Sequence, residues 1–110
     1  MERKPLRFVM AFFLENFMMY ENMEELRKEL DLLDNELIKL ISKRFKFIEQ
    51  AAIIKDDISK IRDNERIENI IGRLRELARD NDISPDIVEK LWRFIIELSI
   101  ELETEIFSKK

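Results

Sequence analysis

A regular apolar pattern runs along residues 23–58 and predicts one long helix. Its positions recur at alternating steps of four and three residues, as in a helix packed against other helices. The positions are Leu26, Leu30, Leu33, Leu37, Leu40, Arg44, Phe47, Ala51, Ile54 and Ile58. Arg44 is the one position that is not apolar. Because desolvating an unpaired charge is costly, the Arg44 guanidinium in a packed seam requires an anion.

A second, shorter helix with the same apolar period is predicted after the long one. We expect a short connection at residues 59–62, where the sequence lacks the glycine or proline that would mark a turn. Asp63 or Asn64 can cap the second helix, because both side chains accept backbone N–H groups at a helix start. The helix is expected to end at residues 80–82, where three turn-forming polar residues follow one another.

A third helix has a clear start signal in Ser84, Pro85 and Asp86. This signal combines a serine cap, a proline at the first helical position and an acid in the first turn. The apolar period continues to about Phe107. One glycine, two prolines and 40% charged residues leave little support for a sheet. The sequence therefore predicts an all-α fold of three helices, one long and two shorter.

The first 22 residues differ from the rest of the chain. A basic stretch precedes an apolar run at residues 8–14, which Glu15 interrupts after seven residues. This run is too short to cross a bilayer and lacks a small-residue cleavage site, so we expect neither a membrane segment nor secretion. We therefore expect a cytoplasmic protein. Residues 1–22 are interpreted as a flexible or loosely docked extension, or as translation from upstream of a functional start at Met23, with the domain at residues 23–110.

Composition narrows the possible chemistry. A chain of 110 residues with 45% hydrophobic residues suits one domain, and short chains of this kind often gain burial by oligomerising. The absence of Cys and His excludes disulfides, thiol nucleophiles, Ser-His triads and ordinary zinc sites. The net charge of −4, with both signs interspersed, does not support nucleic-acid binding. Abundant Lys, Glu and Ile with a single Gln give a thermophile-like composition.

Three cations on the long predicted helix are candidates for binding an anion. Arg44 and Lys55 are 11 residues apart, so they lie within about 20° of one line and about 16 Å apart along the axis. Two long side chains on one face can converge on a ligand between them. Arg27 lies 17 residues before Arg44, about 25 Å away and about 100° around the helix. Arg27 cannot share a small ligand with Arg44 of the same chain, but it can reach a site on a second, antiparallel copy.

Further candidates lie on the two shorter helices. Ser99 and Glu103 are four residues apart and therefore share one side of the third helix. Asp63 and Arg66 open the second helix, one as a cap and the other within reach of a cleft at that end.

Each candidate also has a purely structural interpretation, and singly each supports only a helical protein with a cluster of cations. Arg44 can extend to solvent or pair with a carboxylate such as Asp34. Lys55 can be a solvated residue on the flank of its helix, Asp63 a helix cap and Arg66 a surface charge. Ser99 can be a small residue that allows close helix packing, and Glu103 can be exposed.

Order and spacing together resemble the all-helical chorismate mutase family over residues 23–107. The similarity rests on Leu26-Arg27-Lys28-Glu29-Leu30, Leu33-Asp34, Ser42-Lys43-Arg44, Lys55, Asp63-Asn64-Glu65-Arg66, and Leu91-Trp92 through Ile95-Ile96-Glu97 to Ser99 and Glu103. The resemblance implies an intertwined homodimer of three-helix chains. An Arg from the partner's long helix would complete each active site, which is the role that Arg27 would take.

The activity that the resemblance implies is that of an isomerase. Chorismate is rearranged to prephenate, the step of the shikimate pathway that leads to phenylalanine and tyrosine. This unimolecular pericyclic shift needs no nucleophile, metal or cofactor, so the lack of His and Cys is no obstacle. The enzyme must hold a dianionic substrate in its compact conformer and stabilise charge that develops on the ether oxygen.

The resemblance also implies a role for each candidate residue. Arg44 and the partner's Arg27 would bind the two carboxylates, with Ser99 nearby. The remaining roles are donation to the ether oxygen by Lys55, a backbone contact with the substrate hydroxyl at Asp63, and support of the anion site by Arg66.

Two positions depart from the family pattern. Glu103 stands where many members place a Gln that donates to the ether oxygen, although some fungal members also have Glu. A carboxyl group donates only when protonated, so we predict that catalysis needs neutral Glu103, which burial favours and Lys55 opposes. Ile67 stands where a Glu commonly accepts from the substrate hydroxyl.

The change at Ile67 keeps other functions open. Isochorismate-pyruvate lyases and amino-chorismate mutases share the scaffold and act on ligands with altered ring substituents. A function of another class is a non-catalytic helical module that regulates or binds a partner enzyme.

Overall fold

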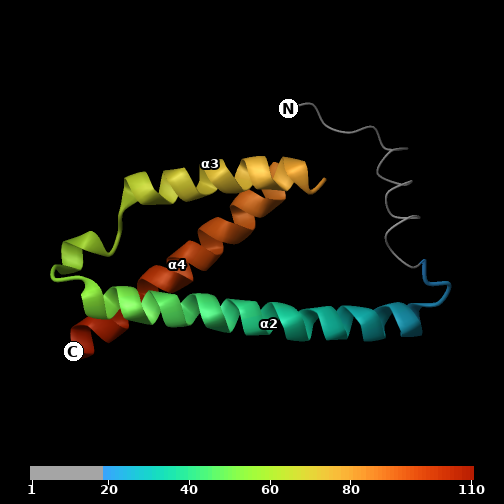
Figure 1. Cartoon of the computed structure of the whole chain (residues 1–110), viewed down its shortest axis with the longest axis horizontal. Coiled ribbons are helices and arrows are strands. Elements are labelled where there is room, and N and C mark those ends of the chain that lie inside the picture. Colours follow the sequence, from blue (N-terminus) through green and yellow to red (C-terminus); the bar gives the residue numbers. More distant parts are fainter. Residues whose placement is uncertain (1–18) are drawn as a thin grey trace. The chain divides into compact units, whose positions relative to one another are not determined.

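The computed structural model describes residues 19–110, which form three α-helices and one short 3-10 helix (Figure 1). In chain order these are α2 (Met23–Ile54), η1 (Ile58–Lys60), α3 (Asn64–Asp80) and α4 (Pro85–Lys109). The described part contains no strand, so the predicted all-α class with one long and two shorter helices is confirmed. Of the extension predicted at residues 1–22, all but the last four residues lie outside the described part. None of the described helices has an apolar stretch long enough to cross a membrane.

The chain divides into an N-terminal unit, residues 1–42, and a C-terminal unit, residues 43–110. The described part of the N-terminal unit is mainly the first section of α2. Asn22 caps this helix, since its side-chain oxygen accepts from the Glu25 N–H at 2.9 Å. No residue between positions 23 and 42 is buried. The leucines of the predicted seam, Leu30, Leu33, Leu37 and Leu40, are 47–64% exposed.

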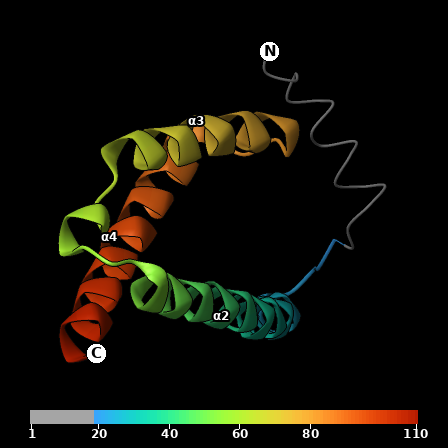
Figure 2. The same ribbon diagram turned by 60° about the vertical axis from the view of Figure 1, so that its left-hand side comes forward.

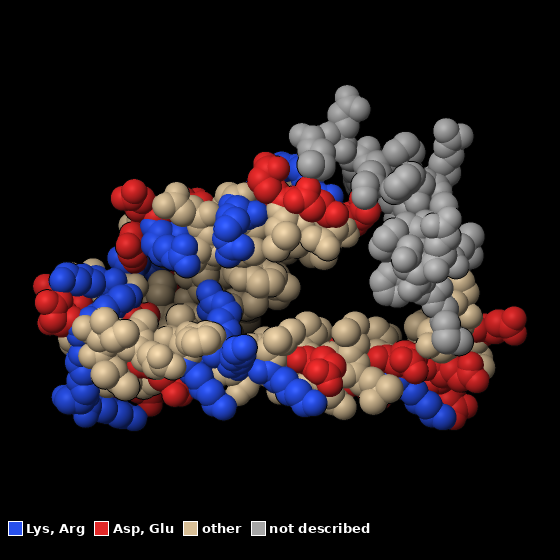
Figure 3. Space-filling view, in the orientation of Figure 1, with Lys and Arg blue, Asp and Glu red and all other residues tan. Residues whose placement is uncertain are grey.

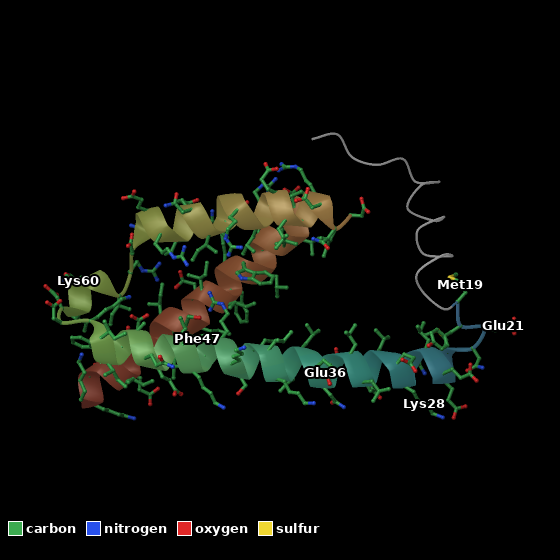
Figure 4. The ribbon with its side chains drawn as sticks, in the orientation of Figure 1. Met19, Glu21, Lys28, Glu36, Phe47 and Lys60 are labelled. Atoms are coloured by element: carbon green, nitrogen blue, oxygen red, sulfur yellow. The ribbon has the colours of Figure 1, made fainter. Side chains whose placement is uncertain are left out.

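The long helix ends earlier than its apolar pattern predicts. We expected helix to about Ile58, whereas α2 ends at Ile54. Asp57 explains the difference, because its side chain accepts from the Ser59 N–H at 2.8 Å and starts η1 instead. The connection to α3 therefore begins at Lys55 rather than at residue 59. Figure 4 shows Lys60 at this connection.

The other two helices begin as predicted. The Asp63 side chain accepts a first-turn N–H of α3 at 3.0 Å, and the chain leaves the helix at Asn81. Ser84 caps α4 in the same way at 3.3 Å, with Pro85 at the first helical position. These caps confirm the two start signals, and α4 continues two residues past the predicted end to Lys109.

The C-terminal unit holds the apolar core. Figures 1 and 2 show α4 starting beside the end of α3 and running back to the C-terminal end of α2. The core lies between α3 and α4 and consists of Ile70, Ile71, Leu74, Ala78, Val88 and Ile96. Ala52 of α2 is also fully buried. The core residues of α3 follow the predicted period, so burial of one face explains the helical pattern.

Ion pairs join α3 to α4 beside this core. Glu89 accepts from Arg93 at 2.8 Å and from Arg75 at 2.9 Å, and Arg93 also pairs with Glu68 at 3.1 Å. The hydrogen bond from Arg93, with a second from Arg75, lowers the pKa of Glu89 below its ordinary value of 4.5. Glu89 therefore binds Arg75 of α3 directly and also holds Arg93, which in turn binds Glu68 of α3.

This pKa shift predicts loss of stability in acid. A carboxylate whose pKa is lowered by folding stabilises the protein above its ordinary pKa, and this contribution is lost as the pH falls through the folded value. We expect the Glu89→Gln change to lower Tm near neutral pH and to reduce the drop in Tm between about pH 5 and about pH 3. Thermal melts followed by circular dichroism measure both effects.

The matched control is Glu101→Gln, because Glu101 is exposed on the same helix and has no ion pair among the described residues. It should melt like the wild type at each pH. A Glu89→Gln variant with an unchanged Tm and an unchanged acid response would contradict the assignment.

Candidate active site

Arg44 of α2 contacts Ser99 of α4. The Arg44 Nη1 atom donates to Ser99 Oγ at 2.8 Å, and the Ser99 hydroxyl donates to the carbonyl of Ile95 at 2.8 Å. Ser99 is only 4% exposed, so its hydroxyl is fixed by these two contacts. One N–H of the guanidinium is thereby oriented, and four of its five donors remain for other partners. Close packing alone does not account for a serine at this position.

Lys55 and Glu103 form the second contact between the end of α2 and α4. The Lys55 Nζ atom lies 2.6 Å from Glu103 Oε1, and the Glu103 side chain is 5% exposed. The Lys55 ammonium is the contact of Glu103 Oε1 within residues 19–110, where this oxygen has no further hydrogen-bond partner. The structure therefore excludes an exposed position for Glu103. The buried carboxylate is therefore compensated by the charge of Lys55.

The two contacts bring the cations together. Arg44 and Lys55 are 11 residues apart, about 16 Å along a helix, whereas Ser99 and Glu103 are one turn apart, about 6 Å along α4. Each cation contacts one member of this pair. The two cationic side chains therefore contact the same side of α4.

Arg66 adds positive charge near Arg44. Burial lowers the pKa of the Arg44 guanidinium, and the charge of Arg66 lowers it further. Arginine still stays protonated at neutral pH, so the site carries two neighbouring guanidinium charges. Among the described residues no carboxylate forms an ion pair with Arg44, and the alternative pairing with Asp34 is not observed. This arrangement attracts an anion from outside the described residues.

The N-terminus of α3 is held in place by an ion pair that the sequence does not reveal. Arg62 donates to Glu97 of α4 through both terminal nitrogens, at 2.9 and 2.6 Å. This bidentate contact attaches the connection directly before Asp63 and Arg66. No local signal indicates such a contact, because its partners are 35 residues apart.

Asp63 and Ile67 share the first turns of α3 but differ in role. The exposed Asp63 carboxylate caps the helix, so this structural interpretation is confirmed. Ile67 is half-buried and packs against the α3–α4 core. An apolar residue at this position therefore contributes to folding and offers no acceptor to a ligand.

Arg27 is not brought together with the other candidates. It lies in the N-terminal unit with an exposed side chain and forms no ion pair or hydrogen bond among the described residues. Its expected contribution to a second copy stays a prediction.

The surface of the C-terminal unit also carries clustered positive charge. On the face drawn in Figure 3, Lys and Arg side chains gather over α3 and the C-terminal half of α2, with Asp and Glu side chains interspersed. The positive charge is local, since the whole chain has a net charge of −4.

Comparison with known proteins identifies the family. A family model described as chorismate mutase type II matches residues 26–104. The chain belongs to the chorismate mutase type II family. The matched segment contains every candidate residue from Arg27 to Glu103, which confirms the resemblance seen in the sequence.

Two relatives illustrate this membership. The chorismate mutase of Methanocaldococcus jannaschii is 32% identical over 88 residues, which cover 79% of this chain and 89% of that protein. A bifunctional chorismate mutase/prephenate dehydratase of Buchnera aphidicola is 27% identical over 84 residues, covering 76% of this chain and 22% of that longer protein. The similarity to the first relative thus extends over most of both chains.

Proposed function

We propose that the site binds chorismate and catalyses its rearrangement to prephenate, so that the chain acts as an isomerase. The observation that carries this proposal is the convergence of Arg44 and Lys55 on α4, with no carboxylate among the described residues paired to Arg44. A ligand with carboxylate groups is complementary to such a site. Family membership favours this function over an isochorismate-pyruvate lyase, an amino-chorismate mutase or a non-catalytic module.

Binding would depend on the guanidinium groups. The hydrogen bond to Ser99 fixes the direction of Arg44, so its remaining donors can take one substrate carboxylate without a large loss of side-chain entropy. Arg66 raises the local positive potential. Holding both ends of a flexible dianion restricts it to the compact conformer from which the reaction proceeds. Asp63 would contact the substrate hydroxyl through its backbone.

Lys55 and Glu103 would act at the ether oxygen. When Glu103 is ionised, its carboxylate forms an ion pair with the Lys55 ammonium at 2.6 Å. Protonation of Glu103 would free the ammonium and would also turn the carboxyl group into a donor. Both groups could then stabilise the negative charge that develops as the carbon–oxygen bond breaks.

We also propose that the working form is a homodimer. Two helical stripes of apolar side chains are exposed, one on the N-terminal section of α2 and one on α4. The α4 stripe consists of Ile87, Leu91, Phe94 and Leu98, which are 37–65% exposed. Soluble monomers rarely expose contiguous apolar patches of this kind, and a second copy carries stripes of the same period that could cover them. Arg27 on the partner's α2 would then complete each site.

The cellular setting follows from the proposed reaction. We place it in the cytoplasm, on the shikimate pathway to phenylalanine and tyrosine, with residues 23–110 as the catalytic domain. No nucleic-acid partner or cofactor is part of the proposal.

The first test removes the anion-binding group. We expect the Arg44→Ala change to lower kcat/KM for chorismate about 100-fold or more, because it removes a charged donor from a partly buried site. The loss of chorismate by purified protein measures this effect. Lys43→Ala is the matched control, since Lys43 is exposed on the same helix and has no ion pair among the described residues.

The same assay separates the alternatives. Turnover of isochorismate to salicylate and pyruvate, without turnover of chorismate, would support the lyase instead. An Arg44→Ala variant as active as the wild type would contradict the proposed site.

The second test concerns the donor that Glu103 would supply at the ether oxygen. The Glu103→Gln change places an amide N–H donor at the same position, so we expect this variant to retain kcat/KM for chorismate. The control Glu101→Gln should also keep the wild-type kcat/KM. Loss of activity in Glu103→Gln would refute the predicted role.

A further inference from the structure

Lys110 holds the C-terminal end of α2, although it lies at the far end of the sequence. Its Nζ atom donates to the carbonyl oxygens of Ala52 at 2.9 Å, Ile53 at 3.2 Å and Lys55 at 2.6 Å. An ammonium group has three N–H donors, so every donor of Lys110 is directed at this one helix end. The same nitrogen lies 4.3 Å from the centre of the Phe107 ring, which can stabilise its charge.

The carbonyl groups at the end of α2 lack a local counter-charge. The last carbonyl groups of a helix lack partners within the helix and carry partial negative charge. The last turn of α2 contains no basic residue, and residues 55–63, which connect it to α3, contain no glycine or proline. Lys110 therefore supplies both the missing donors and the complementary charge.

This contact acts on Lys55, which has a catalytic role in the proposed mechanism. The Lys55 carbonyl accepts from Lys110, while the Lys55 side chain pairs with Glu103. Glu103 is seven residues before Lys110, about two helical turns away, so both anchors belong to the last part of the chain. The main chain and the side chain of Lys55 are thus attached to the same segment, and the direction of the ammonium depends on both contacts.

We propose that Lys110 is a positioning residue that fixes Lys55 for charge stabilisation in the transition state. This inference rests on the proposed role of Lys55. Lys110 itself would touch no substrate, so its effect should appear in the chemical step rather than in the binding of the carboxylates by Arg44.

The experiment compares Lys110→Ala with Lys110→Arg in the chorismate assay of the full chain. We expect Lys110→Ala to lower kcat about tenfold with KM nearly unchanged, because a small misplacement of a catalytic group affects mainly the transition state. Lys110→Arg should recover most of the loss, since a guanidinium also donates several N–H groups. Lys109→Ala is the control, because the partner of Lys109 among the described residues is Glu105 on its own helix, at 2.8 Å.

Each outcome has a defined meaning. Circular dichroism and Tm, measured for all variants, ensure that rates are compared well below unfolding. Wild-type kcat in Lys110→Ala, a rise in KM in place of a fall in kcat, or failure of Lys110→Arg to recover activity would overturn the inference. Lys55→Ala is assayed in parallel. If it keeps wild-type kcat, the proposed role of Lys55 fails, whereas loss in Lys55→Ala without loss in Lys110→Ala refutes only the positioning role.

Discussion

The half-buried guanidinium of Arg44 imposes a constraint that no carboxylate of the described residues meets. A charge removed from water must be compensated, and the contact that Arg44 makes in the described part is a neutral serine hydroxyl. The neighbouring charge of Arg66 adds to the positive charge that must be compensated. A fold that accepts this cost gains a site ready to bind an anion, because the donors are oriented before the ligand arrives. The need to compensate the charge of Arg44 thus favours the binding of an anion at this site.

The apolar face of α2 imposes a second constraint. A helix of 32 residues in water gains most of its stability from packing, yet its N-terminal section buries no residue in the single chain. The C-terminal section is supported by α4 through Ser99, Glu103 and Lys110. Association with a second copy would stabilise the exposed section and would place Arg27 where a second anion-binding group is needed. On this account assembly and catalysis depend on the same helix.

Much of this arrangement could be predicted from local signals. The caps at Asp63 and Ser84 and the apolar period place α3 and α4 correctly, and the four-residue spacing puts Ser99 and Glu103 on one side of α4. Local rules did not place the end of α2, where the Asp57 side chain competes with the helix for backbone N–H groups.

The contacts between distant segments could not be predicted. Two such contacts are the Arg62–Glu97 ion pair and the hydrogen bonds from Lys110 to the end of α2. Both depend on how α4 crosses the other elements, and no spacing along the sequence encodes that crossing. Burial of Glu103 also depends on this crossing. The position of Glu103 along α4 is compatible with an exposed side chain as well as with a buried one. Packing against the α3–α4 core explains the apolar residue at Ile67, and the family pattern of site residues does not indicate this packing.

The most direct test of the shared-site account is complementation between two inactive variants. Arg27→Ala and Arg44→Ala are purified separately, mixed in equal amounts under conditions that allow subunit exchange, and assayed with chorismate. If each site combines Arg44 of one chain with Arg27 of the other, a mixed dimer contains one intact site, and about a quarter of all sites become active. Activity that stays at the level of the separate variants after exchange would contradict the account.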